Sequence, residues 1–444
     1  MKKIILSLFV FLFFITTVQA KAVKRDFSTV INDSGVDIES IAVSIKNADN
    51  GKIVYALNDK MLMNPASVQK VLTAPVAVET LGEDYKFSTS LYSRNDNCYV
   101  LKLGADPYLS SKDLKTLVKN IDREAQKIFI DDRALDNKTW GEGWQWDDDM
   151  NVLMPRFGAY NLDRNLIKIT VMPTKAGQFA TVINPSRYPL VFYNNVVTGD
   201  KTAVNAVRDN AISANTLVLT GTVNKPRTIY IPSNNLKRYF NVQLSRALEE
   251  KSIYFKELML AGKLQETDSL ENTVSHSIEH AIKDTLKNSD NRVSETMFKL
   301  AGGKYLNQAT GSDVAGIKMF NDYCVKNGLD NSRIRIADAS GVSKNNLVSA
   351  KFITEFLLLN KDNEVLQALP TPGEGTLTHR MLPLKNNLKA KTGTLADVST
   401  IAGYLTSKNG KKYVFCIMTN DMKMSASDKK MLEDFIIREM YFKL

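Results

Sequence analysis

The strand pattern at the two ends of this chain most limits how it can fold. Runs that alternate apolar and polar residues, typical of β-strands, lie near both termini, and turn signals such as Asp49-Asn50-Gly51 separate them. The predicted strands cover residues 41–46, 53–57, 388–395, 401–406 and 413–418. Together with the helices predicted beside them, they indicate one antiparallel sheet with helical cover, an α/β (α+β) fold.

Two helices are predicted next to these strands. One begins close to Asn64-Pro65, and Pro75 within its pattern is expected to kink or shorten it, because proline lacks a backbone donor. The other begins near Ser427. Its apolar residues, expected on one face, are Met431, Leu432, Phe435, Ile436 and Met440.

The middle of the chain, residues 95–267, has a different character. It contains many short strand-like runs, at 166–172, 181–184, 190–193 and 216–220. We expect it to be a large, mostly β insertion that forms one or two extra domains. The length of 444 residues also indicates more than one domain.

The first twenty residues indicate export. Lys2 and Lys3 precede an apolar run from Ile4 to Ile15, and small residues follow up to Ala20. This is the layout of a secretory signal peptide cleaved after Ala20. The apolar run is shorter than the ~20 residues that span a bilayer, so an uncleaved anchor is the less favoured alternative and no stable membrane span is expected.

Composition and spacing argue against several other classes of site. The net charge is +10, but Lys and Arg are scattered, and no nucleic-acid motif is present. His276 and His280 are four residues apart on a predicted helix, yet no carboxylate or cysteine cluster accompanies them, so neither a metal nor a cofactor is expected.

Three cysteines, Cys98, Cys324 and Cys416, cannot all pair within one chain. An oxidising compartment allows one disulfide, but the spacing does not select a pair. Cys416 lies in an apolar run and is expected in the core.

Ser67-Val68-Gln69-Lys70 is the first of three motifs that together indicate chemistry. A serine hydroxyl is a weak nucleophile unless a base takes its proton. If this stretch is helical, Lys70 lies on the same face as Ser67. A neutral Lys70, favoured by burial and a nearby positive charge, would be that base.

The other two motifs are Ser289-Asp290-Asn291 and Lys391-Thr392-Gly393-Thr394. Alone, the former is typical of a turn or helix cap, and the latter of an exposed strand. Functionally, Ser289 would relay a proton while Asn291 holds substrate, and Lys391 would supply the charge that keeps Lys70 neutral. Gly393 lets substrate lie against the strand, and the N–H groups of Ser67 and Thr394 would form an oxyanion hole.

The order of the three motifs is the set found in penicillin-binding proteins and class A β-lactamases. Over nearly its whole mature length, the chain resembles the class C low-molecular-mass penicillin-binding proteins, the D-Ala-D-Ala carboxypeptidase/endopeptidase family. Its 222-residue separation of Ser67 from Ser289 is similar to that family's, which carries inserted domains there. Further matching stretches are 103–107, 143–148, 161–165 and 338–343.

The resemblance implies a domain division and residue roles. Residues 21–94 and 268–444 would form a β-lactamase/DD-peptidase-like domain, and 95–267 the inserted domains, with a smaller β-rich domain nested at about 165–235. Ser67 would be the acylated nucleophile and Lys70 its base. The resemblance completes the catalytic set with Ser289, Asn291 and Lys391, and the substrate-binding set with Thr392, Gly393 and Thr394.

A tryptophan-rich segment of the insertion resembles a loop that reaches the active site in this family. Relatives use an aspartate there to hold the free amine of a stem-peptide diamino acid, and Asp148 matches it best, followed by Asp147. The chain departs from the family pattern at Ala339, Lys344 and Ala396, which leaves the substrate preference open.

The expected function is therefore that of an exported, periplasmic serine D-Ala-D-Ala carboxypeptidase and DD-endopeptidase. It would act on peptidoglycan, and β-lactam antibiotics would inhibit it covalently. The alternatives are a β-lactamase-type hydrolase and a non-catalytic peptidoglycan-binding protein. The sequence leaves the oligomeric state open.

Overall fold

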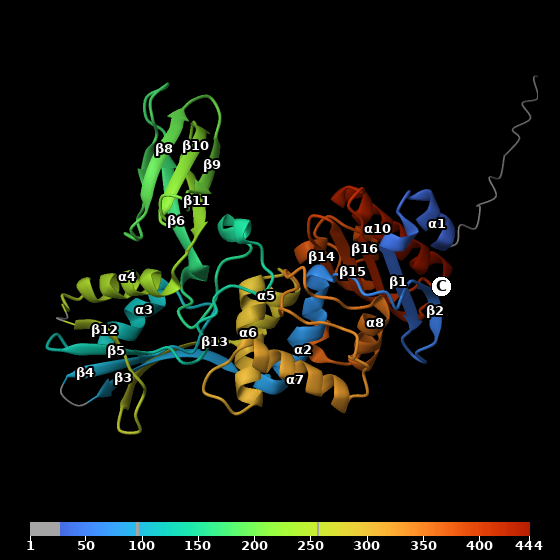
Figure 1. The fold of residues 1–444 in the computed structure, drawn as a ribbon, viewed down its shortest axis with the longest axis horizontal. Helices are drawn as coiled ribbons and strands as arrows, with labels where there is room; N and C mark the ends of the chain where they lie inside the picture. The colour runs from blue at the N-terminus through green and yellow to red at the C-terminus, as the bar shows by residue number, and fades with distance from the viewer. Residues whose placement is uncertain (1–26, 95–96, 255–256) are drawn as a thin grey trace, which may run out of the picture.

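The computed structural model describes residues 27–94, 97–254 and 257–444, and the predicted signal peptide lies outside them. Figure 1 shows two regions side by side. One holds both ends of the described chain, and the other holds its middle. Among the described residues, no helix is long and apolar enough to cross a membrane.

A five-stranded antiparallel sheet organises the region formed by the chain ends. Its strand order is β14-β15-β16-β1-β2, so the first and last thirds of the chain meet where β1 pairs with β16. The strands are β1 (Ile41–Asn47), β2 (Ile53–Leu57), β14 (Leu388–Thr394), β15 (Val398–Thr406) and β16 (Lys412–Asn420). The predicted single sheet and the α/β fold class are confirmed.

Helices cover both faces of this sheet because its strands are apolar on both sides. Ile45 and Phe415 pack on one face with α10, whereas Ala42 and Cys416 pack on the other with α2 and α8. Further helices, α6 among them, complete the second layer. The helices are α1 (Phe27–Asp33), α2 (Lys70–Leu81), α5 (Ile278–Leu286), α6 (Asn291–Tyr305), α7 (Asp313–Lys326), α8 (Ala350–Leu359), α9 (Glu364–Gln367) and α10 (Ala426–Lys443).

The middle of the chain contributes a second five-stranded sheet and two small ones. The larger sheet has the order β12-β5-β4-β3-β13, and the strands that lead into and out of the insertion, β3 and β13, pair with each other. Helices α3 (Ser111–Leu117) and α4 (Leu236–Glu249) pack against each other beside it. Its strands are β3 (Lys86–Arg94), β4 (Cys98–Lys102), β5 (Lys127–Asp131), β12 (Glu257–Ala261) and β13 (Ser269–Ser277).

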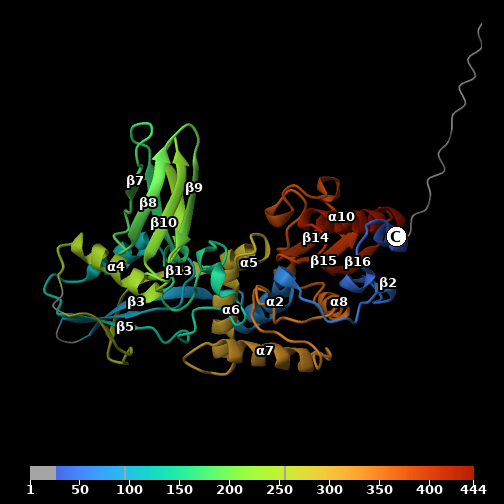
Figure 2. The ribbon, with the colours of Figure 1, turned by 45° about the horizontal axis from the view of Figure 1, so that its top comes forward.

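The two small sheets, β8-β10-β9 and β11-β6-β7, project away from the rest of the molecule (Figures 1 and 2). The four predicted strand runs all lie here, so a mostly β insertion is confirmed. The strands are β6 (Leu166–Met172), β7 (Thr181–Ile183), β8 (Val191–Thr198), β9 (Ala203–Arg208), β10 (Thr216–Val223) and β11 (Arg227–Pro232).

Helix α2 continues past Pro75 to Leu81, so of the two effects expected of this proline the shortening does not occur. Two other local predictions need correction. On α10, Leu432, Ile436 and Met440 are buried as predicted. Met431 and Phe435 are exposed, however, and Ile437, which was not predicted, is buried. The two histidines do not share a helix either, because the one at 276 ends β13 and the one at 280 lies in α5.

Cys416 lies in the core of the sheet, as expected, and Cys324 is buried in α7. Within the described residues, neither is joined to another cysteine.

Candidate active site

Ser67 lies in a single 3₁₀ turn, Ala66–Gln69, that leads directly into α2. The turn is held at its start, where the Asn64 side chain accepts from the Ala66 N–H at 2.8 Å and Thr400 Oγ1 donates to the Pro65 carbonyl at 2.7 Å. Lys70 is the first residue of α2, and its Nζ lies 2.9 Å from Ser67 Oγ. The expected pairing of hydroxyl and amine on one face is therefore present, although a 3₁₀ turn rather than an α-helix produces it.

The Lys70 amine is fully buried and makes two further hydrogen bonds. It donates to Asn291 Oδ1 at 2.7 Å and to the Ser340 carbonyl at 2.6 Å. Burial lowers the pKa of Lys70 from 10.5 to about 8, although the carboxylates of Asp338, Glu295 and Asp290 act in the opposite direction. The amine therefore becomes neutral near pH 8, which suits a general base.

The second motif sits at the start of α6. Asp290 caps the helix, because its side chain accepts from the Val293 N–H at 3.0 Å. Ser289 precedes the cap with a positive φ of 60°, which turns the chain ahead of the helix. Asn291 then points its amide oxygen at Lys70 and donates from Nδ2 to the Leu153 carbonyl at 2.9 Å. The cap is thus also the element that positions Ser289 and Asn291.

The third motif lies on β14, the edge strand of the main sheet. Lys391 is fully buried, and its Nζ donates to Ser289 Oγ at 2.9 Å and to the Thr392 carbonyl at 2.7 Å. Burial first, and then the charge of Lys70, hold the pKa of Lys391 well below its ordinary value. The expectation that Lys391 keeps Lys70 neutral needs correction, because burial is the largest cause of the Lys70 shift.

Gly393 is where β14 and the serine turn come together. A Cβ at this residue would lie 2.7 Å from the Ser67 nitrogen and 2.4 Å from Thr400 Oγ1, so any side chain would push the strand off the turn. Thr394 follows on the exposed end of the strand. The glycine thereby lets the Ser67 amide face the end of β14, as the predicted oxyanion hole requires.

A loop of residues 338–343 completes the site, and its role could not be assigned from the motifs. Its Ser340 carbonyl accepts from Lys70. The buried Glu295 of α6 holds this loop, because it accepts from the Ala339 N–H at 3.1 Å and from the Ser340 N–H at 2.8 Å. Burial, followed by the charge of Asp338, raises the pKa of Glu295 to about 8. The only sequence signal for Glu295 was its position four residues after Asn291, one helical turn along.

The insertion also reaches the site. Trp144 Nε1 donates to Asp338 Oδ2 at 2.9 Å, which ties the tryptophan-rich segment to the 338–343 loop. Asp148 follows in the short 3₁₀ helix Trp146–Met150. Burial, and then the charge of Asp147, raise the pKa of Asp148, while Asn151 and the charge of Lys344 act in the opposite direction. No interaction between Asp148 and the three motifs is found among the described residues.

The structure therefore brings together two hydrogen-bonded groups, one of Ser67, Lys70 and Asn291 and the other of Ser289 and Lys391. Thr392 and Gly393 flank this site on β14, Thr394 lies at its open end, and Asp148 lies further out on the insertion. Within the described part of the chain, no cluster of three or more histidine, cysteine or acidic residues could hold a metal.

Comparisons of this chain with a family model and with known proteins agree on one family. The model of the D-Ala-D-Ala carboxypeptidase 3 (S13) family matches residues 23–438. The chain is 26% identical over 407 residues to the D-alanyl-D-alanine carboxypeptidase DacB of Haemophilus influenzae, which covers 84% of each chain. It is 24% identical over 441 residues to the D-alanyl-D-alanine carboxypeptidase of an Actinomadura species, covering 89% of this chain and 80% of that protein.

Solved structures show that the fold is shared. Penicillin binding protein 4 (dacB) of Haemophilus influenzae superposes with a TM-score of 0.81 at 23% identity, covering 94% of this chain and 100% of that one. The structure of the same protein complexed with a novel β-lactam superposes with a TM-score of 0.76 at 22% identity, covering 94% and 99%.

Proposed function

This chain belongs to the D-Ala-D-Ala carboxypeptidase 3 (S13) family, and from that premise we propose that Ser67 is its acylated nucleophile and Lys70 the base that activates it. The protein is a serine-type D-Ala-D-Ala carboxypeptidase. The observation that supports the assignment most directly is the 2.9 Å contact between Ser67 Oγ and a buried Lys70 amine whose pKa is about 8.

In the acylation step, Ser67 Oγ attacks the carbonyl carbon of the penultimate D-Ala while neutral Lys70 takes the hydroxyl proton. The carbonyl oxygen becomes an oxyanion, which the N–H groups of Ser67 and Thr394 stabilise. The bond to the terminal D-Ala nitrogen then breaks, and the leaving amine receives a proton that Lys391 donates through Ser289. Ser289 suits this relay because its hydroxyl accepts a hydrogen bond from Lys391.

In the deacylation step, water attacks the ester carbonyl and gives a proton to Lys391 through Ser289. The bond to Ser67 Oγ then breaks, and Lys70 returns its proton to the serine oxygen. The substrate carboxylate lies against β14. The hydroxyls of Thr392 and Thr394 donate hydrogen bonds to it, and Lys391 supplies a positive charge. Asn291 holds the substrate backbone. An amine other than D-Ala can leave in the same way, so cleavage of cross-links as a DD-endopeptidase is part of the proposal.

The biological setting follows from the same assignment. We place the mature protein in the periplasm after cleavage of a signal peptide at residue 20, where its substrate is the stem peptide of peptidoglycan. β-Lactams mimic that peptide and acylate Ser67. Asp148, with Lys344 beside it, holds the free amine of the stem peptide's diamino acid.

The domain division also remains a proposal. Residues 21–94 and 268–444 form the catalytic domain, 95–267 form the insertion, and a β-rich domain is nested at about 165–235. The pairing of β3 with β13 supports moving both borders outward, so that Lys86–Arg94 and Ser269–Ser277 belong to the insertion.

Intact-mass spectrometry after incubation with benzylpenicillin tests the assignment. The mature protein should gain the mass of one penicillin, and a Ser67→Ala variant should gain none. A folded wild-type protein without an adduct would refute the nucleophile and favour a non-catalytic peptidoglycan-binding role. Rapid nitrocefin turnover, with no lasting adduct, would instead indicate a β-lactamase.

A further inference from the structure

A cavity of about 560 Å³ lies at the end of the main sheet, away from the three motifs. It is formed where β14 begins, β15 ends and β16 begins, together with the chain that follows α8. None of its lining residues belongs to the three motifs. Lys389, on its wall, is two residues before Lys391 and five before Thr394 on β14, which corresponds to roughly 7 and 17 Å along an extended strand. Its volume is within the range of small-ligand sites. The cavity is thus distinct from the catalytic site but belongs to the same strand.

Six charged residues line this cavity, and they carry an excess of positive charge. Lys361, Lys385, Lys389 and Lys412 face two aspartates, Asp49 and Asp362. Among the described residues, none of the six forms an ion pair with another side chain. The lysine amines therefore remain available to a ligand of opposite charge.

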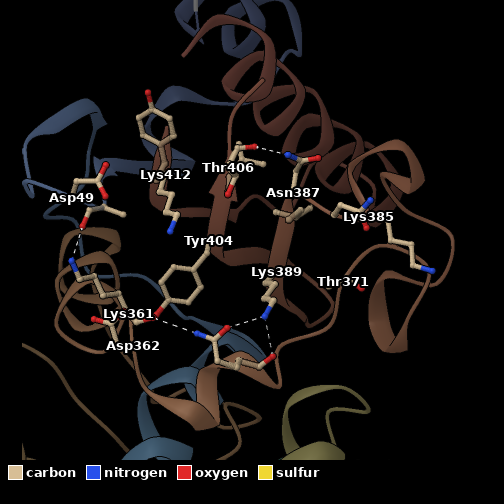
Figure 3. Close-up of a pocket in the computed structure, with 16 residues that line it drawn as sticks. Asp49, Lys361, Asp362, Thr371, Lys385, Asn387, Lys389, Tyr404, Thr406 and Lys412 are labelled. Carbon is tan, nitrogen blue, oxygen red and sulfur yellow. Dashed lines mark hydrogen bonds between the residues drawn. The ribbon is translucent and has the colours of Figure 1, made fainter. Parts of the chain in front are cut away.

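Figure 3 shows how these side chains lie around Tyr404. The Lys412 amine points toward the ring, the Lys361 amine points to the side of Asp49 and Ala48, the Lys389 amine points toward Gln367, and the Lys385 side chain points outward. Within the described residues, two of these lysines bond only to uncharged groups, because Lys361 donates to the Ala48 carbonyl at 3.4 Å and Lys389 donates to Gln367 Oε1 at 2.8 Å. Exposed amines with uncharged partners retain most of their attraction for an anion.

Tyr404 gives the cavity a fixed floor. Its hydroxyl donates to the Leu357 carbonyl at 2.9 Å, which anchors the ring between β15 and the end of α8. The ring itself is half-buried and presents apolar surface to the cavity. An apolar floor surrounded by charges suits a flexible peptide better than a simple inorganic anion, which would use only the charges.

We propose that this cavity is a second binding site for the enzyme's polymer, which takes a short acidic peptide with free carboxylates. Carboxylates would pair with Lys361, Lys389 and Lys412, and the two aspartates would accept any free amine of the peptide. The proposal rests on the proposed function, because a D-Ala-D-Ala carboxypeptidase acts on peptides that end in a free carboxylate. A neighbouring stem peptide held here would keep the enzyme on its polymer between cleavages.

Calorimetry on protein already acylated by benzylpenicillin tests this site, because the adduct occupies the catalytic site. The probe is a soluble muropeptide with a tetrapeptide stem, titrated at low salt. The acylated wild type should bind it, and a Lys361→Gln, Lys389→Gln, Lys412→Gln triple variant should bind at least tenfold more weakly. Methyl esterification of the probe's carboxylates should cause a similar loss.

A matched control removes the same charge elsewhere. Lys175, Lys201 and Lys225 are exposed on the small β-sheets, and their triple glutamine variant should bind the probe within twofold of wild type. Absence of binding to the wild type, or equal binding by the two triple variants, would overturn the proposal. A failure of Ser67 acylation would show separately in the mass spectrum, and binding to unacylated Ser67→Ala protein would still report on the cavity.

Discussion

The charged residues of the catalytic region and the part of the insertion that lies next to them differ in burial. Lys70, Lys391 and Glu295 are all buried, and every one of them is hydrogen-bonded to another part of the site. The insertion approaches the same site with exposed groups, including Trp146, which is 83% exposed, and Leu153, which is 71% exposed. Under the proposed function, reactivity would be set in the buried region, and the insertion would select the substrate.

The physical basis of the difference is the cost of burying charge. A buried amine loses hydration, which shifts its pKa and makes each remaining hydrogen bond important to its position. An exposed loop has no such requirement, and it touches the catalytic residues through the Leu153 carbonyl, which accepts from Asn291. Changes in the two regions should therefore differ in size and in kind.

The largest difference is expected for lysine replacement. Lys70→Met keeps the aliphatic stem but removes the base, so the rate of acylation by benzylpenicillin should fall about 10³-fold. Lys168 is an exposed residue of β6 in the insertion, and Lys168→Met should leave that rate unchanged. Stopped-flow or quenched mass measurements give both rates. A loss below tenfold for Lys70→Met would mean that another group takes the Ser67 proton.

A pair of glycines compares the two regions for stability. Gly341 and Gly177 have similar φ values, +82° and +78°, but a Cβ at Gly341 would lie 1.8 Å from the Ala66 carbonyl, while nothing lies within 4 Å at Gly177. Gly177→Ala should cost about 1 kcal/mol for the left-handed backbone alone. Gly341→Ala should cost about 3 kcal/mol or more, because the loop must also move away from the serine turn.

Thermal unfolding and the acylation rate distinguish the two glycine variants. Gly341→Ala should lower both the melting temperature and the rate, since Ala66 directly precedes the nucleophile. Gly177→Ala should lower the melting temperature slightly and leave the rate intact. Similar losses of stability in both variants would contradict the close packing of the 338–343 loop on the serine turn.

The sequence predicted the sheet and the three motifs well because both depend on local pattern. Strand alternation placed β1, β14 and β16 within a residue or two of their observed bounds. The contribution of Glu295 and of the Ser340 and Leu153 carbonyls could not be predicted. Backbone carbonyls leave no mark in a sequence, and which of them meets Lys70 or Asn291 is decided by tertiary packing.

The errors have a related cause. The apolar spacing on α10 fitted two overlapping faces, and packing against the sheet selected the one that buries Ile437 rather than Phe435. His276 and His280 matched a helical spacing, but β13 ends between them, and its pairing with β3 decides that boundary. The spacing of residues in the sequence does not show which of two competing sets of tertiary contacts is more stable.

A smaller effect is expected in the insertion, on the KM for the peptide rather than on the acylation rate. Asp148→Asn should raise the KM for a stem peptide with a free diamino-acid amine about tenfold, as the loss of one charged hydrogen bond would. The acylation rate with benzylpenicillin should stay within twofold, because the antibiotic has no such amine. Asp147→Asn is the matched control and should change neither value. An equal effect on a peptide with an acetylated amine would contradict the assignment of Asp148.

The smallest effect is expected from removing the negative charge of Glu295, which acts on Lys70. Because Lys70 must be neutral to act as base, acylation should slow as the pH falls below about 8, the pKa of its amine. The charge of Glu295 raises that pKa. Glu295→Gln should therefore move the acid limb of the rate–pH profile, where the rate falls as Lys70 gains a proton, to lower pH by less than one unit. A glutamine oxygen can still accept from the Ser340 N–H, so the loop should keep its place.

The control for this shift is another buried glutamate. Glu433 is equally buried but bonds to Ser399 and Arg380 on the far face of the sheet, so Glu433→Gln should leave the limb where it is. Rate measurements across pH 5.5 to about 9.5 cover both variants around the pKa near 8. An unmoved limb in Glu295→Gln would mean that Glu295 carries a proton while Lys70 titrates. The pKa of Lys70 would then be set by burial and by the charges of Asp338 and Asp290, and Glu295 would act only by holding the loop that carries the Ser340 carbonyl.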